Sequence, residues 1–154
     1  MKRILSLLLC MILITGMQVT PAFAALEWPS NVSVEAEGAD AVSLINTLVG
    51  MRIDIESRRP ILHQNTGGLS GPAVLPVAVR MVWEVAQAVK IPILGMGGVS
   101  RGEDAAQLML AGATAVAVGT ALFADPYAPI KVRDELGQIA QRQGLTAVKE
   151  LTGQ

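Results

Sequence analysis

Short apolar runs recur along this chain, and the segments between them repeat apolar residues at a helical period. Residues 39–46 (ADAVSLIN), 91–96 (IPILGM) and 115–118 (AVAV) form the runs, and each predicts a buried strand. The first and third runs are introduced in the same way, by Gly-Ala-x-Ala-Val at residues 38–42 and 112–116. This internal echo supports a repeated unit of strand and helix.

Two long helices are predicted from apolar positions that share one face. Pro72 suits the first turn of the earlier helix. Its apolar face consists of Ala78, Val82, Val85 and Val89. The later helix follows Asp125-Pro126 and stops at Gly144, and Thr146 is the expected start of a last short helix. The apolar face of the later helix consists of Val132, Leu136 and Ile139.

A shorter helix is predicted between the second and third strands and runs to about Ala111, where Gly112 closes it. Ser100 and Glu103 are expected to form a capping box at its start, in which the serine oxygen accepts a backbone N–H and the glutamate reaches back. The order of strands and helices predicts an α/β fold with a parallel sheet, because parallel strands need crossover connections.

The connection between the first strand and the first helix has a different pattern. Ile53 and Ile55 alternate with polar residues, as do Ile61 and His63, which predicts a protruding hairpin around a charged turn. Residues 65–71 (NTGGLSG) are expected to form a glycine-rich loop. His63 is the only histidine, and its position away from the strand ends favours a surface or packing role over acid–base chemistry.

Composition narrows the classes of function. The chain has 154 residues, enough for one domain but fewer than the roughly 250 of a complete (β/α)8 barrel. Aromatic residues make up 3% and the formal net charge is −1, so neither a stacking surface nor a basic stripe for nucleic acid is expected. No metal-ligand spacing occurs, and Ser70 has no histidine placed to activate it, so metal and serine hydrolase chemistry are not expected.

The first 24 residues differ from the rest. Two basic residues precede the apolar run 4–17, and residues 22–24 (AFA) match a small-x-small cleavage site. This pattern predicts a secretory signal peptide over residues 1–24, and a retained membrane anchor is the alternative. Residues 25–37 are expected to be a linker or the remains of an element. Cys10 is the only cysteine and lies inside the apolar run, so the mature chain would lack thiol chemistry.

The ends of the predicted strands carry the candidate chemistry, because functional groups in parallel sheets gather at the carboxyl ends of strands. The residues at these ends are Asn46, Thr47, Gly97, Gly98, Gly119 and Thr120. Glycines allow a phosphate to approach the backbone, and following helix N-termini favour its charge, so a phosphate cradle is predicted. Asn46 and Thr47 offer donors and acceptors to a small planar polar substrate. The alternative is that the glycines only turn tight loops.

Five segments in order, SLINTLVGMRID, NTGGLSGPA, IPILGMGGV, AGATAVAVGT and ALFADP, resemble the C-terminal part of class 1 dihydroorotate dehydrogenases of the NAD-linked branch. These enzymes are FMN-containing barrels that oxidise dihydroorotate to orotate in pyrimidine biosynthesis. The resemblance implies that residues 38–154 form a partial (β/α)8 TIM barrel, the C-terminal three βα units (about strands 6–8). It also implies a cytoplasmic flavoprotein oxidoreductase, which conflicts with the export that the leader predicts.

The resemblance implies roles for matching residues. Ile45 would pack on the flavin, and Asn46 and Thr47 would hydrogen-bond the orotate. Gly71 would line the flavin site. The FMN phosphate would be cradled by Gly97, Gly98, Gly119 and Thr120. No catalytic residue is carried over, because the family's first strands, with the cysteine that acts as base, have no counterpart here, and Cys10 lies in signal-like surroundings.

Two classes of function stay open. One is a dihydroorotate dehydrogenase-like flavoprotein, expected to be a truncated form that is inactive by itself. The other is a non-catalytic remnant that binds FMN or phosphate, exported or anchored to a membrane. Three barrel strands also leave two open sheet edges, which predicts self-association or a partner that supplies the missing half of the barrel.

Overall fold

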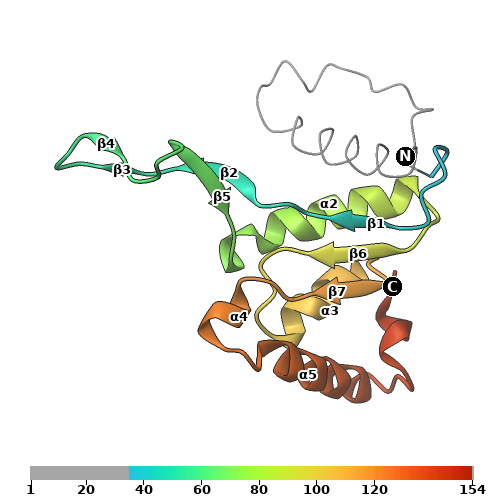
Figure 1. The fold of residues 1–154 in the computed structure, drawn as a ribbon. Coiled ribbons are helices and arrows are strands. Elements are labelled where there is room, and N and C mark those ends of the chain that lie inside the picture. The colour runs from blue at the N-terminus through green and yellow to red at the C-terminus, as the bar shows by residue number, and fades with distance from the viewer. Residues whose placement is uncertain (1–34, 154) are drawn as a thin grey trace.

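Three parallel strands form the sheet of this protein, whose computed structural model describes residues 35–153 (Figure 1). They are β1 (Val42–Leu44), β6 (Ile93–Met96) and β7 (Ala115–Ala117), hydrogen-bonded in the order β1-β6-β7. All three predicted strands are present, each shorter than its apolar run. The predicted leader at residues 1–24 lies outside the described residues, as does most of the predicted linker.

The two faces of the sheet differ in exposure. Val42 pairs with Ile93 and Leu44 pairs with Gly95, and the side chains of Val42, Leu44 and Ile93 are buried. Because successive side chains alternate between faces, Ser43 and its partner Leu94 lie on the opposite face, where both are more exposed. The helices therefore cover one face of the sheet.

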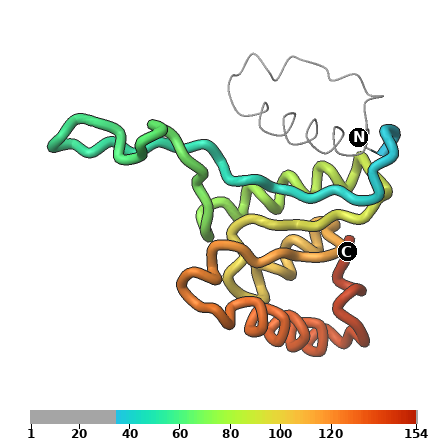
Figure 2. The backbone as a smooth tube through the Cα atoms, in the orientation of Figure 1, coloured from blue at the N-terminus to red at the C-terminus, as the bar shows by residue number. Residues whose placement is uncertain are grey.

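Along the chain, helical segments come after each of the three parallel strands (Figures 1 and 2). The 3-10 turn η2 (Pro72–Val74) leads into α2 (Leu75–Ala88), and α3 (Gly102–Leu110) joins β6 to β7. The short α4 (Ala121–Ala124), which the sequence pattern missed, precedes α5 (Ala128–Arg142), and η3 (Val148–Leu151) is a 3-10 helix near the C-terminus. Helices α2 and α3 lie on the same face of the sheet, and α5 packs on α3.

The core lies between the sheet and these helices. Its largest fully buried side chains are Leu44, Val82, Leu108 and Leu151. The predicted apolar residues of α5 (Val132, Leu136 and Ile139) are all buried. Gly95 allows α3 to pack closely, because a Cβ there would lie 2.9 Å from the Cβ of Ala113 and 3.4 Å from that of Leu108. No helix among residues 35–153 is long and apolar enough to cross a bilayer.

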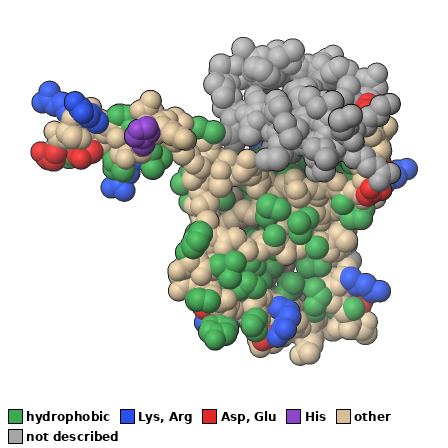
Figure 3. Space-filling model, viewed as in Figure 1, with side chains coloured by type: hydrophobic (Ala, Val, Ile, Leu, Met, Phe, Trp, Pro, Cys, Tyr) green, Lys and Arg blue, Asp and Glu red, His purple; other side chains and the backbone are tan. Residues whose placement is uncertain are grey.

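A two-stranded arm projects from the body between β1 and α2 (Figures 1 and 3). β2 (Leu48–Met51) pairs antiparallel with β5 (Thr66–Leu69), and β3 (Ile53–Asp54) pairs with β4 (Arg59–Pro60) at the tip. Basic and acidic side chains gather at the far end of the arm. The predicted hairpin is confirmed, and His63 is exposed on it.

The expectation of a glycine-rich loop at residues 65–71 is wrong in part, because Thr66–Leu69 is a strand. Its glycines permit close contacts within the arm. A Cβ on Gly68 would overlap the side chain of Thr47, and a Cβ on Gly67 would lie 2.5 Å from Cδ1 of Leu62. The glycines therefore mark close packing in a ribbon rather than a break in regular structure.

We expect Leu108→Ala to lower the free energy of unfolding by about 2–5 kcal/mol, because it empties a fully buried site. Leu110→Ala is the matched control on the same helix, since Leu110 is 37% exposed, and its loss should be much smaller. Urea denaturation of both variants measures the difference. Equal losses would contradict the placement of the core.

Asp125 joins α4 to α5 and carries an ion pair. Lys131 Nζ lies 2.5 Å from Asp125 Oδ2, and the backbone N–H of Tyr127 donates to Oδ1 at 2.9 Å. The hydrogen bond from Lys131, supported by that from Tyr127, holds the pKa of Asp125 below its ordinary value. Because the pKa is lower in the folded state, Asp125 stabilises the fold above its unfolded pKa, and this stability is lost as the pH falls through the folded pKa.

We expect Lys131→Met to raise the pKa of Asp125, as an NMR titration of the carboxyl carbon would measure. The variant and the wild type should differ in unfolding free energy at neutral pH and converge in acid. Arg133→Met is the control, because Arg133 pairs with Asp134 instead. An Asp125 pKa that is the same in wild type and Lys131→Met would refute the assignment.

Candidate functional site

A cavity of about 310 Å³ opens at the carboxyl ends of the three parallel strands. Segments that follow each strand line it. They contribute Ile45, Asn46 and Thr47 after β1, Gly97, Gly98 and Val99 after β6, and Val118, Gly119 and Thr120 after β7. Seven of the eight residues predicted to bind substrate or cofactor therefore meet at one place, because crossover connections bring the strand ends to the same edge.

Three backbone N–H groups at this edge have no partner in the described part of the chain. Among residues 35–153, none accepts a hydrogen bond from the N–H of Gly98, Gly119 or Thr120. By contrast, the N–H of Ile45 donates to the carbonyl oxygen of Met96 at 2.9 Å. Unpaired backbone donors on the wall of a cavity suit an acceptor-rich ligand or water.

The glycines of the site are not equivalent. Gly98 has a φ of +80°, and a Cβ there would lie 2.8 Å from the Cβ of Leu75 and 3.0 Å from the carbonyl oxygen of Gly71. The fold itself thus requires glycine at position 98. A Cβ on Gly119 would meet nothing within 4 Å, so no described neighbour requires that glycine. The open space at Gly119 is what a ligand group would occupy.

Gly71 is the one predicted site residue that does not line the cavity. It lies just before η2 with a φ of +91°, and its carbonyl is beside Gly98. The neighbouring Ser70 lines the cavity in its place. Gly71 therefore lies in the turn that starts the following helix, and its role at the flavin site stays a prediction.

Asn46 and Thr47 are exposed at the mouth of the cavity. Asn46 Oδ1 accepts a hydrogen bond from the backbone N–H of Thr47 at 2.8 Å, and Thr47 packs its side chain against Gly68 of the arm. No described residue accepts a hydrogen bond from the amide NH₂ of Asn46. Asn46 can therefore donate to a ligand, while the arm helps to fix Thr47.

Sequence reasoning missed further residues of the wall: Ser43, Ser70, Met96 and Ala117. Ser43 and Met96 lie on the sheet face away from the helices. The alternation of buried and exposed residues in the strands is the signal that would have found them. Ser70 has no such signal, because only the return of the arm brings it to the cavity.

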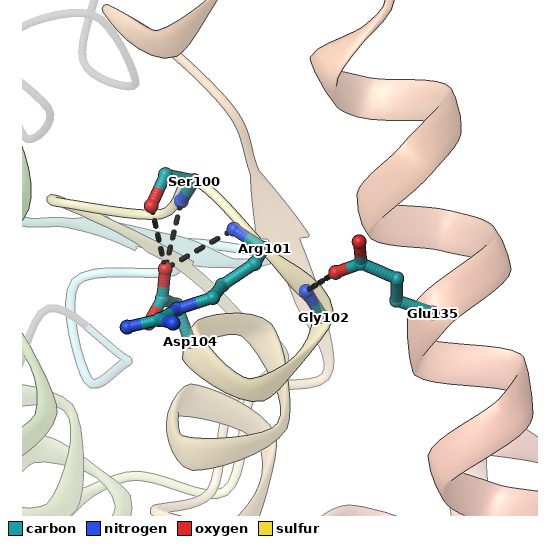
Figure 4. A network of polar contacts seen from close by, with 5 residues as sticks. All are labelled: Ser100, Arg101, Gly102, Asp104 and Glu135. Carbon is teal, nitrogen blue, oxygen red and sulfur yellow. Dashed lines mark hydrogen bonds and ion pairs between the residues drawn. The ribbon is translucent and has the colours of Figure 1, made fainter.

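The start of α3 is held by two carboxylates (Figure 4). Asp104 Oδ2 accepts hydrogen bonds from the N–H of Ser100 at 2.9 Å and the N–H of Arg101 at 3.1 Å. The hydroxyl of Ser100 also donates to Asp104 Oδ2, at 2.9 Å. Glu135 of α5 accepts from the N–H of Gly102 at 2.6 Å. The helix therefore begins one residue later than the predicted capping box requires.

The predicted capping box is wrong in two respects, which are the acidic residue that reaches back and the role of the serine. Asp104, not Glu103, reaches back, and Ser100 donates its hydroxyl instead of accepting a backbone N–H. Because three N–H groups at the start of α3 are already bound by carboxylates, they are not available to an anion. The donors for an anion are those of the glycine segments instead.

The cavity wall carries no charged side chain. None of its lining residues is an Asp, Glu, Lys, Arg or His. Among the residues that the structure describes, no group of three His, Cys, Asp or Glu side chains is placed to hold a metal ion. Recognition of a charged ligand at this wall therefore rests on backbone N–H groups and on the polar side chains of the wall, which are Ser43, Asn46, Thr47, Ser70 and Thr120.

Comparison with known proteins gives consistent results. The family model for dihydroorotate dehydrogenase matches residues 16–140. The catalytic subunit of dihydroorotate dehydrogenase B (NAD(+)) of Parabacteroides distasonis is 60% identical over 121 residues, which are 79% of this chain and 40% of that protein. The same subunit of Geobacter metallireducens is 64% identical over 115 residues, 75% of this chain and 38% of that protein. A putative dihydroorotate dehydrogenase A (fumarate) of Solibacter usitatus is 46% identical over 136 residues, which are 88% of this chain and 44% of that protein.

A solved structure agrees with these matches. The crystal structure of the dihydroorotate dehydrogenase of Eimeria tenella, in complex with ferulenol, superposes with a TM-score of 0.66 at 30% identity, over 80% of this chain and 33% of that one. The expectation that this chain forms part of a (β/α)8 barrel is thereby confirmed. The chain spans about two fifths of the length of the curated relatives that it matches. From the family match over most of its residues, this chain belongs to the dihydroorotate dehydrogenase family.

Proposed function

We propose that this chain provides the part of a dihydroorotate dehydrogenase that binds the FMN phosphate and contacts the substrate. The unpaired N–H groups of Gly98, Gly119 and Thr120, which belong to residues that line one cavity at two strand ends, carry this proposal. Such donors recognise a phosphate without any basic side chain. The names of the relatives support dihydroorotate as the substrate and an NAD(+)-linked enzyme as the type.

The geometry of the site fits this group of ligands. A volume of about 310 Å³ is at the lower end for small-molecule sites, which suits one end of a nucleotide-sized molecule. The open space at Gly119 would take phosphate oxygens, and the buried Ile45 offers an apolar surface to the flavin. Asn46, whose NH₂ group has no described acceptor, would donate to a carbonyl or carboxylate oxygen of orotate, with Thr47 beside it.

When bound, FMN supplies the electron-accepting chemistry of dihydroorotate oxidation. The residues of this chain bind and orient the two molecules. No Cys, His, Asp or Glu lines the cavity within the described part, so none of them is placed there to take a proton from the substrate. A general base contributes about 10²–10⁴-fold to such a step. We therefore propose that the chain by itself binds FMN without appreciable turnover.

We expect Gly119→Val to raise the Kd for FMN at least tenfold, about 1.4 kcal/mol, because the new side chain fills the open space beside the N–H donors. Gly137→Val is the matched control, since a Cβ at position 137 of α5 also meets nothing within 4 Å but lies outside the cavity. Flavin absorbance and fluorescence titration of the full chain measure the affinity.

Orotate formation is assayed on the same preparations. Bound FMN without turnover is the expected result. No flavin binding by the wild-type chain would refute the proposed site, and turnover by the chain alone would refute the proposal that it only binds. An equal loss of FMN affinity in the Gly119 and Gly137 variants would show that the cavity is not the binding site.

We also propose that the chain associates through its sheet edges. Within the described part, β1 and β7 each pair with β6 alone, so one edge of each strand is unpaired. Such edges pair readily with another strand, from a second copy or from a polypeptide that supplies the rest of a barrel. Size-exclusion chromatography with light scattering should give a mass above that of one chain. A strictly monomeric profile at high concentration would be evidence against this association.

A further inference from the structure

Asp104 is the only buried charged side chain among residues 35–153, with 5% of its surface exposed. The proposed function does not use it, and it does not line the cavity. Burial of a carboxylate is costly unless hydrogen bonds compensate it. The hydrogen bonds of Asp104 must therefore offset the cost of its burial, and they indicate what the residue does.

The hydrogen bonds of Asp104 fasten one end of the glycine loop. Its Oδ2 binds the N–H and hydroxyl of Ser100 and the N–H of Arg101, at 2.9, 2.9 and 3.1 Å (Figure 4). Ser100 lies only two residues after Gly98. The weaker ion pair between Asp104 Oδ1 and Arg101 Nε, at 3.7 Å, adds little because Arg101 is exposed.

The other end of the loop is fixed by the sheet. Met96 is the last residue of β6, and its carbonyl oxygen accepts the N–H of Ile45 at 2.9 Å. Between these two anchors lie Gly97 and Gly98, and the N–H of Gly98 has no acceptor in the described part of the chain. Glycine has the largest backbone freedom of all residues, so this pair needs external support to hold one geometry.

We infer that Asp104 is a positioning residue, which holds the Gly97-Gly98 loop, and with it the unpaired N–H of Gly98, in the arrangement that receives the phosphate. This inference rests on the proposed function. Donors that are fixed before binding lose less conformational entropy when the ligand arrives, and the affinity is higher for that reason. The buried carboxylate is compatible with a nearby phosphate because its Oδ2 is fully engaged by three donors.

The test compares FMN with riboflavin, which lacks only the phosphate. In Asp104→Ala, we expect the Kd for FMN to rise at least tenfold and the Kd for riboflavin to stay within twofold. Asp104→Asn should restore most of the FMN affinity, because its amide oxygen can accept the same three hydrogen bonds. Asp104→Ser replaces the alanine variant if that variant does not fold.

Glu135→Ala is the matched control. It removes the other carboxylate at the start of α3, on Gly102, but leaves the loop anchor at Ser100 in place. The ratio of FMN to riboflavin affinity should stay at the wild-type value in this variant. Equal losses of FMN and riboflavin affinity in Asp104→Ala, or the same change of ratio in Glu135→Ala, would overturn the inference.

A measurement without ligand separates this inference from the proposed function. NMR relaxation of the unliganded wild-type chain should give order parameters near 0.85 for the N–H groups of Gly97 and Gly98, and Asp104→Ala should lower them below about 0.6. Unchanged order parameters would overturn the positioning role even if FMN binds. Lowered order parameters in a chain that binds no flavin would support the loop anchor and refute the proposed ligand.

Discussion

The close approach of the Gly97-Gly98 loop to its neighbours is the constraint on which the site depends. A Cβ at Gly97 would lie 3.0 Å from the Cβ of Ala78 in α2 and 3.1 Å from Cγ1 of Ile45 after β1. Gly98 is equally close to Leu75, in the first turn of α2. Without side chains at these two positions, the end of β6 sits directly against the end of β1 and the start of α2. The strand ends then share one cavity.

The sequence predicted the sheet because each strand is a short apolar run bounded by turn residues. It predicted the long helices as well, since the buried residues of α2 and α5 follow a helical period. Val89 is an exception, because it lies just beyond the end of α2 with an extended backbone. The strands of the arm were harder to predict. β5 contains two glycines, which are needed there because Leu62 and Thr47 lie too close for a side chain. Contacts of this kind come from tertiary structure, and a local pattern does not encode them.

The start of α3 shows how a small error in a boundary changes a functional interpretation. With Ser100 as the cap, the acid three residues later is Glu103. The helix begins at Gly102, so the cap is Arg101 and the acid at the third position is Asp104. Glu103 and Asp104 are adjacent acids, and only the three-dimensional packing decides which one is buried. The convergence of Asn46 with the glycine segments needed only the topology and was predictable.

The uncharged wall of the cavity has a consequence for how a ligand would respond to acidity. No group on this wall changes its charge between pH 5 and 8, because none of the lining residues titrates in that range. A phosphate ester does, with a second ionisation near pH 6. The protonation of the bound phosphate, and not that of the protein, would therefore determine how the affinity changes as the solution becomes acidic.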